Sequence, residues 1–195
     1  VETKEGDSVR RLGTIRAPGM SSTFVALNAG KESVVLDFGR AEDREVLLAL
    51  VERADVLIEN FRPGVLARLG LGDEVLRVRA YDPIIQAESG MAPAGADGEP
   101  RLMPQYVCDK VTGLYTAQAV TAALFARARG EPAATVEVSM LEAAVAFGWI
   151  DLHGPQTFLE PATPMPNIAL LYRPWRTADG WVVVVMLGEA EVAGW

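Results

Sequence analysis

The order of secondary-structure signals over residues 33–69 constrains the fold more than any other feature of this sequence. The short β-branched run 33–37 predicts a buried strand, and residues 55–59 predict a second one. Between them, residues 41–54 carry apolar side chains every three or four positions, which indicates an amphipathic helix. A Pro-Gly turn and a short helix follow at 60–69. This alternation of strands and helices predicts an α/β fold with a parallel sheet.

The second half of the chain is richer in helix. The Ala-rich apolar run 110–127 predicts a long helix, and residues 140–152 predict another. Residues 135–138 alternate between apolar and polar side chains, as a strand does, and residues 181–187 are also strand-like. The proline-rich stretch 155–166 indicates a linker, because proline interrupts a helix.

Both ends of the chain and one internal junction look interrupted. Residues 1–7 resemble the end of a strand that enters a loop, and residues 188–191 begin a helix with almost no sequence after it. After the short helix predicted at 73–76, residues 77–79 run directly into the stretch 80–83. This is too little chain for the strand that an α/β pattern requires next. We therefore expect a truncated chain that also lacks a segment near residues 77–79.

The composition excludes several classes of protein. With 26 acidic and 18 basic residues the net charge is −8, which argues against a nucleic-acid or membrane-surface binder. No apolar run approaches the roughly 18 residues that a membrane-spanning helix needs. A single cysteine, Cys108, rules out an internal disulfide and favours the reducing cytoplasm. With one cysteine and one histidine, His153, the sequence predicts no metal site.

Asp109 is the residue with the most chemical interest. It follows the β-like run 105–108 and precedes the long helix predicted from Lys110. Aspartate is a good N-cap, so one interpretation of Asp109 is purely structural. The other is a carboxylate nucleophile at a strand-to-helix turn, where amide groups of the helix stabilise the anion and face an oxyanion on a bound carbonyl. The residues alone leave both interpretations open.

Other polar residues also have a structural and a functional interpretation. Arg62, Arg68 and Arg79 lie in or near turns, where they are either solvated or suited to a phosphate-rich ligand. His153 is interpreted as a C-terminal capping residue of the helix that it follows rather than as a catalytic group. Cys108 is interpreted as a small core residue, because no basic neighbour lowers the pKa of its thiol.

Taken together, these stretches resemble the class III (CaiB/BaiF-type) CoA-transferase family, which includes formyl-CoA transferase and carnitine CoA-transferase. The most diagnostic stretch is Glu-Asn-Phe-Arg-Pro-Gly at residues 59–64. The resemblance covers nearly the whole chain in the family's order, and its other matching stretches are 27–37, 54–58, 65–70, 81–90, 109–115, 136–140 and 177–181.

The resemblance implies a two-domain organisation and a dimer. A large CoA-binding domain with a Rossmann-like parallel sheet is expected at 1–154, followed by a linker at 155–174 and the start of a smaller α+β domain at 175–195. The family's first strand would lie before Val1 and is absent here. Two chains of this family interlock like linked rings, so an obligate homodimer is expected.

The resemblance also implies a reaction, the exchange of CoA between an acyl-CoA and a free carboxylic acid without a metal. The matching aspartate, Asp109, attacks the thioester carbonyl to give a mixed anhydride, and the CoA thiolate then forms an aspartyl-CoA thioester. A family lysine close to Leu36 is replaced here by Gly39, with Arg40 adjacent. The residues expected to contact CoA are Leu36, Asn60, Phe61, Arg62, Arg68, Arg79 and Asp82.

Two alternatives to the transferase remain. α-Methylacyl-CoA racemase has the same fold, but it needs a histidine immediately before the aspartate that matches Asp82, and Tyr81 stands there. A phenol with a pKa near 10 is a poor substitute for an imidazole with a pKa near 6.5, so the transferase is favoured. The second alternative is a CoA-binding homologue without catalytic activity. The sequence does not indicate which acyl-CoA or which acid is used.

Overall fold

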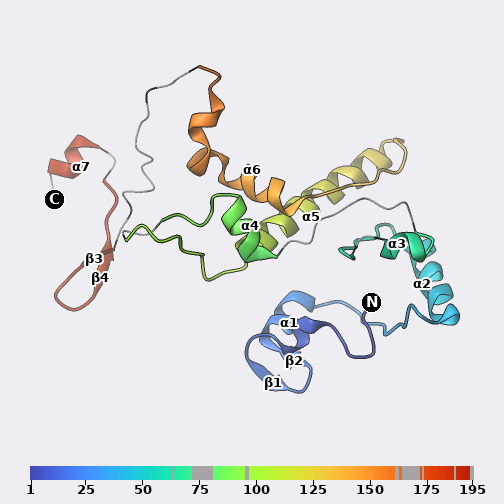
Figure 1. Ribbon diagram of the computed structural model, residues 1–195. Helices are drawn as coiled ribbons and strands as arrows, with labels where there is room; N and C mark the ends of the chain where they lie inside the picture. The colour runs from blue at the N-terminus through green and yellow to red at the C-terminus, as the bar shows by residue number, and fades with distance from the viewer. Residues whose placement is uncertain are drawn as a thin grey trace. The chain divides into compact units, whose positions relative to one another are not determined.

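The computed structural model divides the chain into two compact units, Val1–Arg79 and Ala80–Trp195 (Figure 1). It mixes helices with short strands. The structure describes residues 1–62, 64–71, 81–94, 97–160, 163, 172, 174–186 and 188–193.

The first unit contains short helices and one small antiparallel sheet. In that sheet Ile15 pairs with Ser21 and Ala17 with Met20. Ser21 is also the N-cap of the next helix, where its hydroxyl accepts a hydrogen bond from the Phe24 amide at 3.0 Å. The elements are η1 (Ser8–Arg11), β1 (Ile15–Ala17), β2 (Met20–Ser21), α1 (Ser22–Asn28), α2 (Ala41–Arg53) and α3 (Val65–Arg68).

Two helices predicted for the first unit are confirmed and its strands are not, while the short helix predicted at 73–76 lies outside the described residues. Helices α2 and α3 form where the sequence places them, and α3 follows Gly64, whose φ of 79° favours glycine. The strand predicted at 33–37 is reduced to one parallel bridge between Glu2 and Val35, and no strand forms at 55–59. Helices close their hydrogen bonds locally, whereas a strand needs a paired neighbour, which local sequence cannot reveal.

A small apolar cluster holds the first unit together. Its buried members are Leu36, Leu47 of α2 and Leu69 after α3. Much of the apolar stripe of α2 lies outside this cluster, since Val46 and Leu50 are exposed. The partly buried side chains that pack against the cluster are Val34, Phe38, Val51, Val65 and Leu71.

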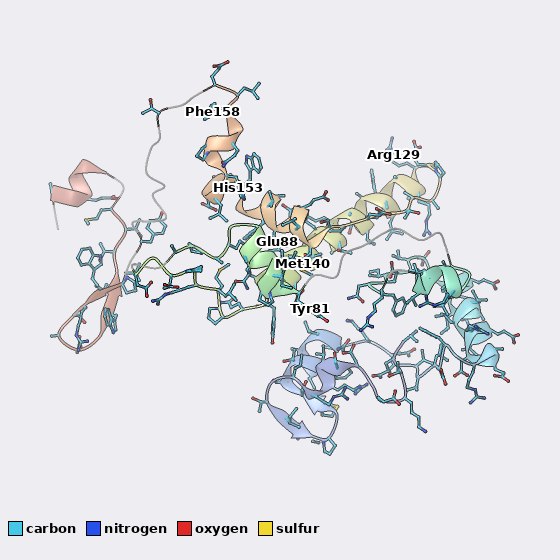
Figure 2. All side chains as sticks on the ribbon, in the orientation of Figure 1. Tyr81, Glu88, Arg129, Met140, His153 and Phe158 are labelled. Atoms are coloured by element: carbon cyan, nitrogen blue, oxygen red, sulfur yellow. The ribbon has the colours of Figure 1, made fainter. Side chains whose placement is uncertain are left out.

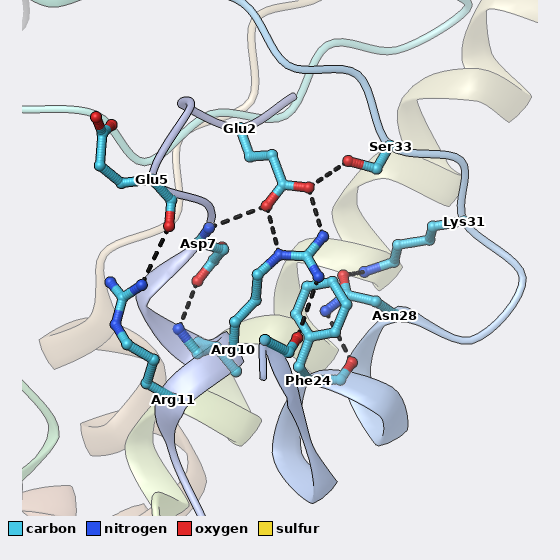
Figure 3. A network of polar contacts seen from close by, with 11 residues as sticks. Glu2, Glu5, Asp7, Arg10, Arg11, Phe24, Asn28, Lys31 and Ser33 are labelled. Carbon is cyan, nitrogen blue, oxygen red and sulfur yellow. Dashed lines mark hydrogen bonds and ion pairs between the residues drawn. The ribbon is translucent and has the colours of Figure 1, made fainter. Parts of the chain in front are cut away.

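A network of hydrogen bonds around Glu2 links distant segments of the same unit (Figure 3). The Glu2 carboxylate accepts hydrogen bonds from Arg10 Nε at 2.7 Å and Nη2 at 2.5 Å, from the Asp7 amide at 3.0 Å and from the Ser33 hydroxyl. The Arg10 guanidinium stacks 3.8 Å from the ring centre of Phe24. These donors hold the pKa of Glu2 well below its usual range, with Arg10 the largest cause.

The second unit is built around three helices. Helix α5 (Val107–Ala128) packs against α6 (Met140–Leu152) and α4 (Asp82–Glu88). Their buried core contains Ile85, Met91, Cys108 and Ala144. The remaining elements are η2 (Gly154–Thr157), β3 (Pro174–Arg176), β4 (Trp181–Val183) and α7 (Glu189–Ala193), with β3 and β4 paired as an antiparallel hairpin.

The predictions for this unit are confirmed in part. Helix α6 has the predicted bounds, but α5 begins at Val107, three residues before the predicted start. The strand predicted at 135–138 is not formed, and the strand-like run 181–187 is a strand only as far as Val183. The junction at 77–79 lies outside the described residues.

The exposed apolar side chains of α5 and α6 do not indicate a membrane span. Leu114 and Phe125 of α5 and Ile150 of α6 are exposed. Among the described residues, none of the helices combines the length and apolar character that crossing a bilayer requires.

Candidate active site at the start of helix α5

Asp109 is the third residue of α5 and not its N-cap. The N-cap position belongs to Tyr106, whose side chain makes no capping hydrogen bond. The interpretation of Asp109 as an N-cap is therefore wrong, because the helix already begins at Val107. Within the first turn the Asp109 carboxylate still lies at the positive end of the helix dipole.

The Asp109 carboxylate is exposed and unpaired. Within the described part of the chain it makes no hydrogen bond or ion pair. Its pKa is raised above the ordinary value of 3.8, chiefly because neighbouring atoms displace part of its solvent and also because Asp82 is negatively charged. A more basic carboxylate donates its lone pair more readily, so this environment favours a nucleophile.

Asp82 contacts the first turn of α5 through a hydrogen bond. It is the first residue of α4 and is 4% exposed. Its Oδ2 accepts a hydrogen bond from the Asp109 amide at 3.0 Å, and its Oδ1 accepts one from Gln86 Nε2 at 2.5 Å. Both carboxylate oxygens are thus occupied by the protein.

Gln86 is a residue of this site to which the sequence analysis assigned no role. It lies one turn after Asp82 on α4 and is 2% exposed. Its amide nitrogen also donates to the Gln105 carbonyl at 3.0 Å, and its Oε1 accepts from the Met103 amide at 2.8 Å. The available signal was a polar residue four positions after an aspartate, which places both side chains on one face of a helix.

Cys108 and His153 have the structural roles predicted for them. Cys108 is fully buried, and burial, with the charges of Asp82 and Asp109, raises the pKa of its thiol to about 11. His153 is the C-cap of α6 (Figure 2), and its Nε2 lies 3.1 Å from the Ser89 carbonyl at the end of α4. The histidine thus joins the ends of two helices.

The other residues expected to contact CoA lie in the first unit. Leu36 is buried in the apolar cluster, and Phe38 meets Phe61 edge-to-face with ring centres 5.9 Å apart. The Phe61 amide donates to the Glu59 carboxylate at 2.7 Å. Asn60, Arg62 and Arg68 are exposed, and Arg79 lies outside the described residues.

The structure therefore divides the predicted site residues between its two units. Asp82 and Asp109 are brought together in the second unit, and the segments around Leu36, Phe61 and Arg68 pack within the first. Over the described residues, no group of three or more histidine, cysteine, aspartate or glutamate side chains is placed to hold a metal ion.

Comparison with known proteins identifies the family. A family model described as CoA-transferase family III matches residues 1–80 and 77–195. A probable fatty acyl-CoA transferase from Mycobacterium tuberculosis is 30% identical over 223 residues, covering 94% of this chain and 57% of the relative. An acetyl-CoA:oxalate CoA-transferase from Acetobacter aceti is 35% identical over 167 residues, covering 73% of this chain and 43% of the relative.

Solved structures agree with this assignment. A CAIB/BAIF family protein from Brucella suis has a TM-score of 0.77 at 28% identity, covering 92% of this chain and 56% of that one. A hypothetical protein from Mycobacterium tuberculosis has a TM-score of 0.75 at 28% identity, covering 94% of this chain and 55% of that one. The chain thus spans about half the length of these relatives, from 43% to 57%. Because the family model matches both units, the chain belongs to CoA-transferase family III.

Proposed function

We propose that the protein transfers CoA between an acyl-CoA thioester and a free carboxylic acid, with Asp109 as the nucleophile. The observation that carries this proposal is an exposed carboxylate with a raised pKa in the first turn of a 22-residue helix, without a hydrogen-bond or ion-pair partner among the described residues. The relatives named as CoA-transferases support the same reaction.

The reaction needs only carboxylates, a thioester and a thiolate. An Asp109 oxygen attacks the thioester carbon, and the C–S bond breaks to give a mixed anhydride and CoA thiolate. The thiolate then attacks the aspartyl carbonyl, which releases the first carboxylate and leaves aspartyl-CoA. The acceptor carboxylate attacks this thioester to form a second mixed anhydride, and the returning thiolate takes the new acyl group and frees Asp109.

The position of Asp109 suits this sequence of attacks. Carboxylates are weak nucleophiles, so the enzyme gains most by holding one beside the thioester in place of a chance encounter. The positive end of the α5 dipole favours the oxyanion that forms as the thioester carbon is attacked. The raised pKa of Asp109 adds basicity to the attacking oxygen.

For CoA itself we propose contacts in the first unit. Exposed Arg62 and Arg68 suit its phosphates, because guanidinium groups pair with phosphate through two hydrogen bonds. Exposed Phe61 offers an aromatic face to adenine. Leu36, Asn60 and Arg79 complete the proposed set on the family resemblance. Asp82 is the exception, because both of its oxygens bond within the protein.

The larger organisation is also a proposal. We infer a large CoA-binding domain at 1–154 with a Rossmann-like parallel sheet, a linker at 155–174, the start of a small domain at 175–195, and an interlocked homodimer. The missing segment near 77–79 is supported by the way in which the family model matches, in two stretches that meet at residues 77–80.

An exchange assay on the full-length protein tests the function. The protein is incubated with an acyl-CoA and a panel of isotopically labelled carboxylic acids, and labelled acyl-CoA is the expected product. Deuterium uptake from heavy water into a chiral 2-methylacyl-CoA, without an acceptor acid, would show a racemase instead. Tight CoA binding with neither reaction would show a non-catalytic homologue.

A further inference from the structure

Gln86 is a buried polar side chain of the second unit with hydrogen bonds at both ends of its amide. It is 2% exposed. Nε2 donates to Asp82 Oδ1 at 2.5 Å and to the Gln105 carbonyl at 3.0 Å, while Oε1 accepts from the Met103 amide at 2.8 Å. Burial of so polar a group is costly unless every atom is paired, so its orientation is strongly fixed.

Two routes lead from Gln86 to Asp109. The first passes through Asp82, whose Oδ2 accepts the hydrogen bond of the Asp109 amide at 3.0 Å. The second passes through the segment 103–105, which leads directly into Tyr106, the N-cap of α5. Gln86 therefore holds both the entry of the chain into α5 and the acceptor for an amide in its first turn.

The helix depends on this outside support. The first amides of a helix have no partner within it and are normally satisfied by the N-cap side chain. The Tyr106 side chain makes no such bond, and Asp82, 27 residues before Asp109 in the sequence, supplies the acceptor. The backbone of this turn sets the direction of the Cα–Cβ bond of Asp109.

We propose that Gln86 is a positioning residue for Asp109 and acts through Asp82 and through the segment 103–105. The proposal rests on the proposed function, because it assigns to Gln86 the alignment of the attacking carboxylate. Attack requires the reacting atoms to lie about 3–3.5 Å apart, and a misplacement of about 1 Å can lower a rate a hundredfold. A loss of alignment lowers the rate of attack without weakening the binding of CoA.

The test compares Gln86→Met with Ser89→Ala in the full-length protein. Gln86→Met keeps the length and removes the amide. Ser89→Ala removes an equally buried hydroxyl, which donates to the Gln86 backbone carbonyl at 3.5 Å and leaves the Gln86 side-chain amide and its contact with Asp82 in place. The measurements are the single-turnover rate at which Asp109 is acylated at saturating acyl-CoA, the Kd for CoA, and the melting temperature.

We expect Gln86→Met to lower the rate ten- to hundredfold with the Kd for CoA changed less than about twofold, and Ser89→Ala to keep the wild-type rate. Combining Gln86→Met with Asp82→Asn should slow the rate by less than the product of the two single effects, because both changes break the contact between Gln86 and Asp82. If Gln86→Met does not fold, Gln86→Glu takes its place, since it keeps the shape but cannot donate to Asp82 when ionised.

Three results would overturn the proposal: a wild-type rate in the Gln86 variant, an equal loss in Ser89→Ala, or additive effects in the double variant. These outcomes leave the proposed function intact, because wild-type Asp109 is still acylated in each. If the wild-type protein itself forms no adduct on Asp109, the proposed function fails and the positioning role falls with it.

Discussion

The two units use charged groups in opposite ways. In the first unit the Glu2 carboxylate is surrounded by donors, and its pKa is lowered. In the second unit the Asp109 carboxylate has no such donor among the described residues, and its pKa is raised. A carboxylate thus links distant segments of the first unit through hydrogen bonds, whereas in the second unit a carboxylate is available for reaction.

The two carboxylates differ in which of their groups the surrounding residues hydrogen-bond. Around Glu2, the donors of Arg10 and Ser33 bind the carboxylate itself. Around Asp109, the backbone amide donates to Asp82, and within the part of the chain that the structure describes the side chain has no hydrogen-bond partner. Hydrogen bonds to a carboxylate stabilise its anion and lower its nucleophilicity, so an unpaired carboxylate held by its backbone suits catalysis better.

Asp109→Asn is expected to have the largest effect. Replacing the carboxylate by an amide removes the nucleophile, so CoA exchange should fall on the order of a thousandfold or more while the fold is kept. Exchange rates of the purified full-length variant measure the loss. Glu88→Gln, which changes an exposed carboxylate of neighbouring α4, is the matched control and should stay close to wild type. An active Asp109→Asn would remove the contrast between the two units.

The pH dependence of acylation sharpens the contrast. Attack needs ionised Asp109, so the rate should fall as the pH drops through the raised pKa, at a higher pH than for an ordinary aspartate. In Asp82→Asn the neighbouring negative charge is gone, so the acid limb should move to lower pH even though the plateau rate also falls. Single-turnover rates across the acid range measure both. If the acid limb of the pH–rate profile lay at the same pH in Asp82→Asn as in wild type, the charge of Asp82 would not act on Asp109.

Glu2→Gln should alter stability and its pH dependence. Because the pKa of Glu2 is lowered by folding, its stabilisation is present above the unfolded pKa near 4.5 and is lost as the pH falls through the folded pKa. The variant should therefore melt below wild type at neutral pH, and the gap should close in strong acid. Glu5→Gln, an exposed carboxylate of the same segment, is the control and should melt like wild type. A pH-independent gap would show that the ion pair is not the cause.

Gly113→Ala is expected to have the smallest effect, and stability and activity should move in opposite directions. Gly113 lies one turn after Asp109 on α5, and an added Cβ would meet nothing within 4 Å. Alanine should therefore stabilise the helix by about 0.5–1 kcal/mol. If acyl-CoA approaches along this face, the same methyl group should reduce kcat/KM several-fold. Higher stability with unchanged kcat/KM would place the substrate elsewhere.

Local sequence predicted the helices but not the contacts between elements. The bounds of α6 followed from its apolar run, and the structure adds its N-cap, Ser139, whose hydroxyl accepts from the Glu142 amide. The strand predicted at 135–138 did not form, because a strand depends on a neighbour that periodicity does not specify. Sequence patterns therefore located helices well and strands poorly.

The candidate site shows the same limit. Sequence singled out Asp109, but placed it at the helix start, because an aspartate before a helical run resembles an N-cap. The true acceptor for this turn is Asp82, which is distant in the sequence and meets α5 only after folding. The link from Gln86 to the segment 103–105 is equally non-local, so no motif could reveal it.

Trapping the intermediate on Asp109 tests the central claim most directly. The full-length protein is mixed with acyl-CoA, quenched, digested and analysed by mass spectrometry. We predict an acyl or CoA adduct on the peptide that contains Asp109, absent from Asp109→Asn and present in the Glu88→Gln control. CoA exchange that proceeds with no adduct on this peptide, or an adduct on another residue, would contradict the claim.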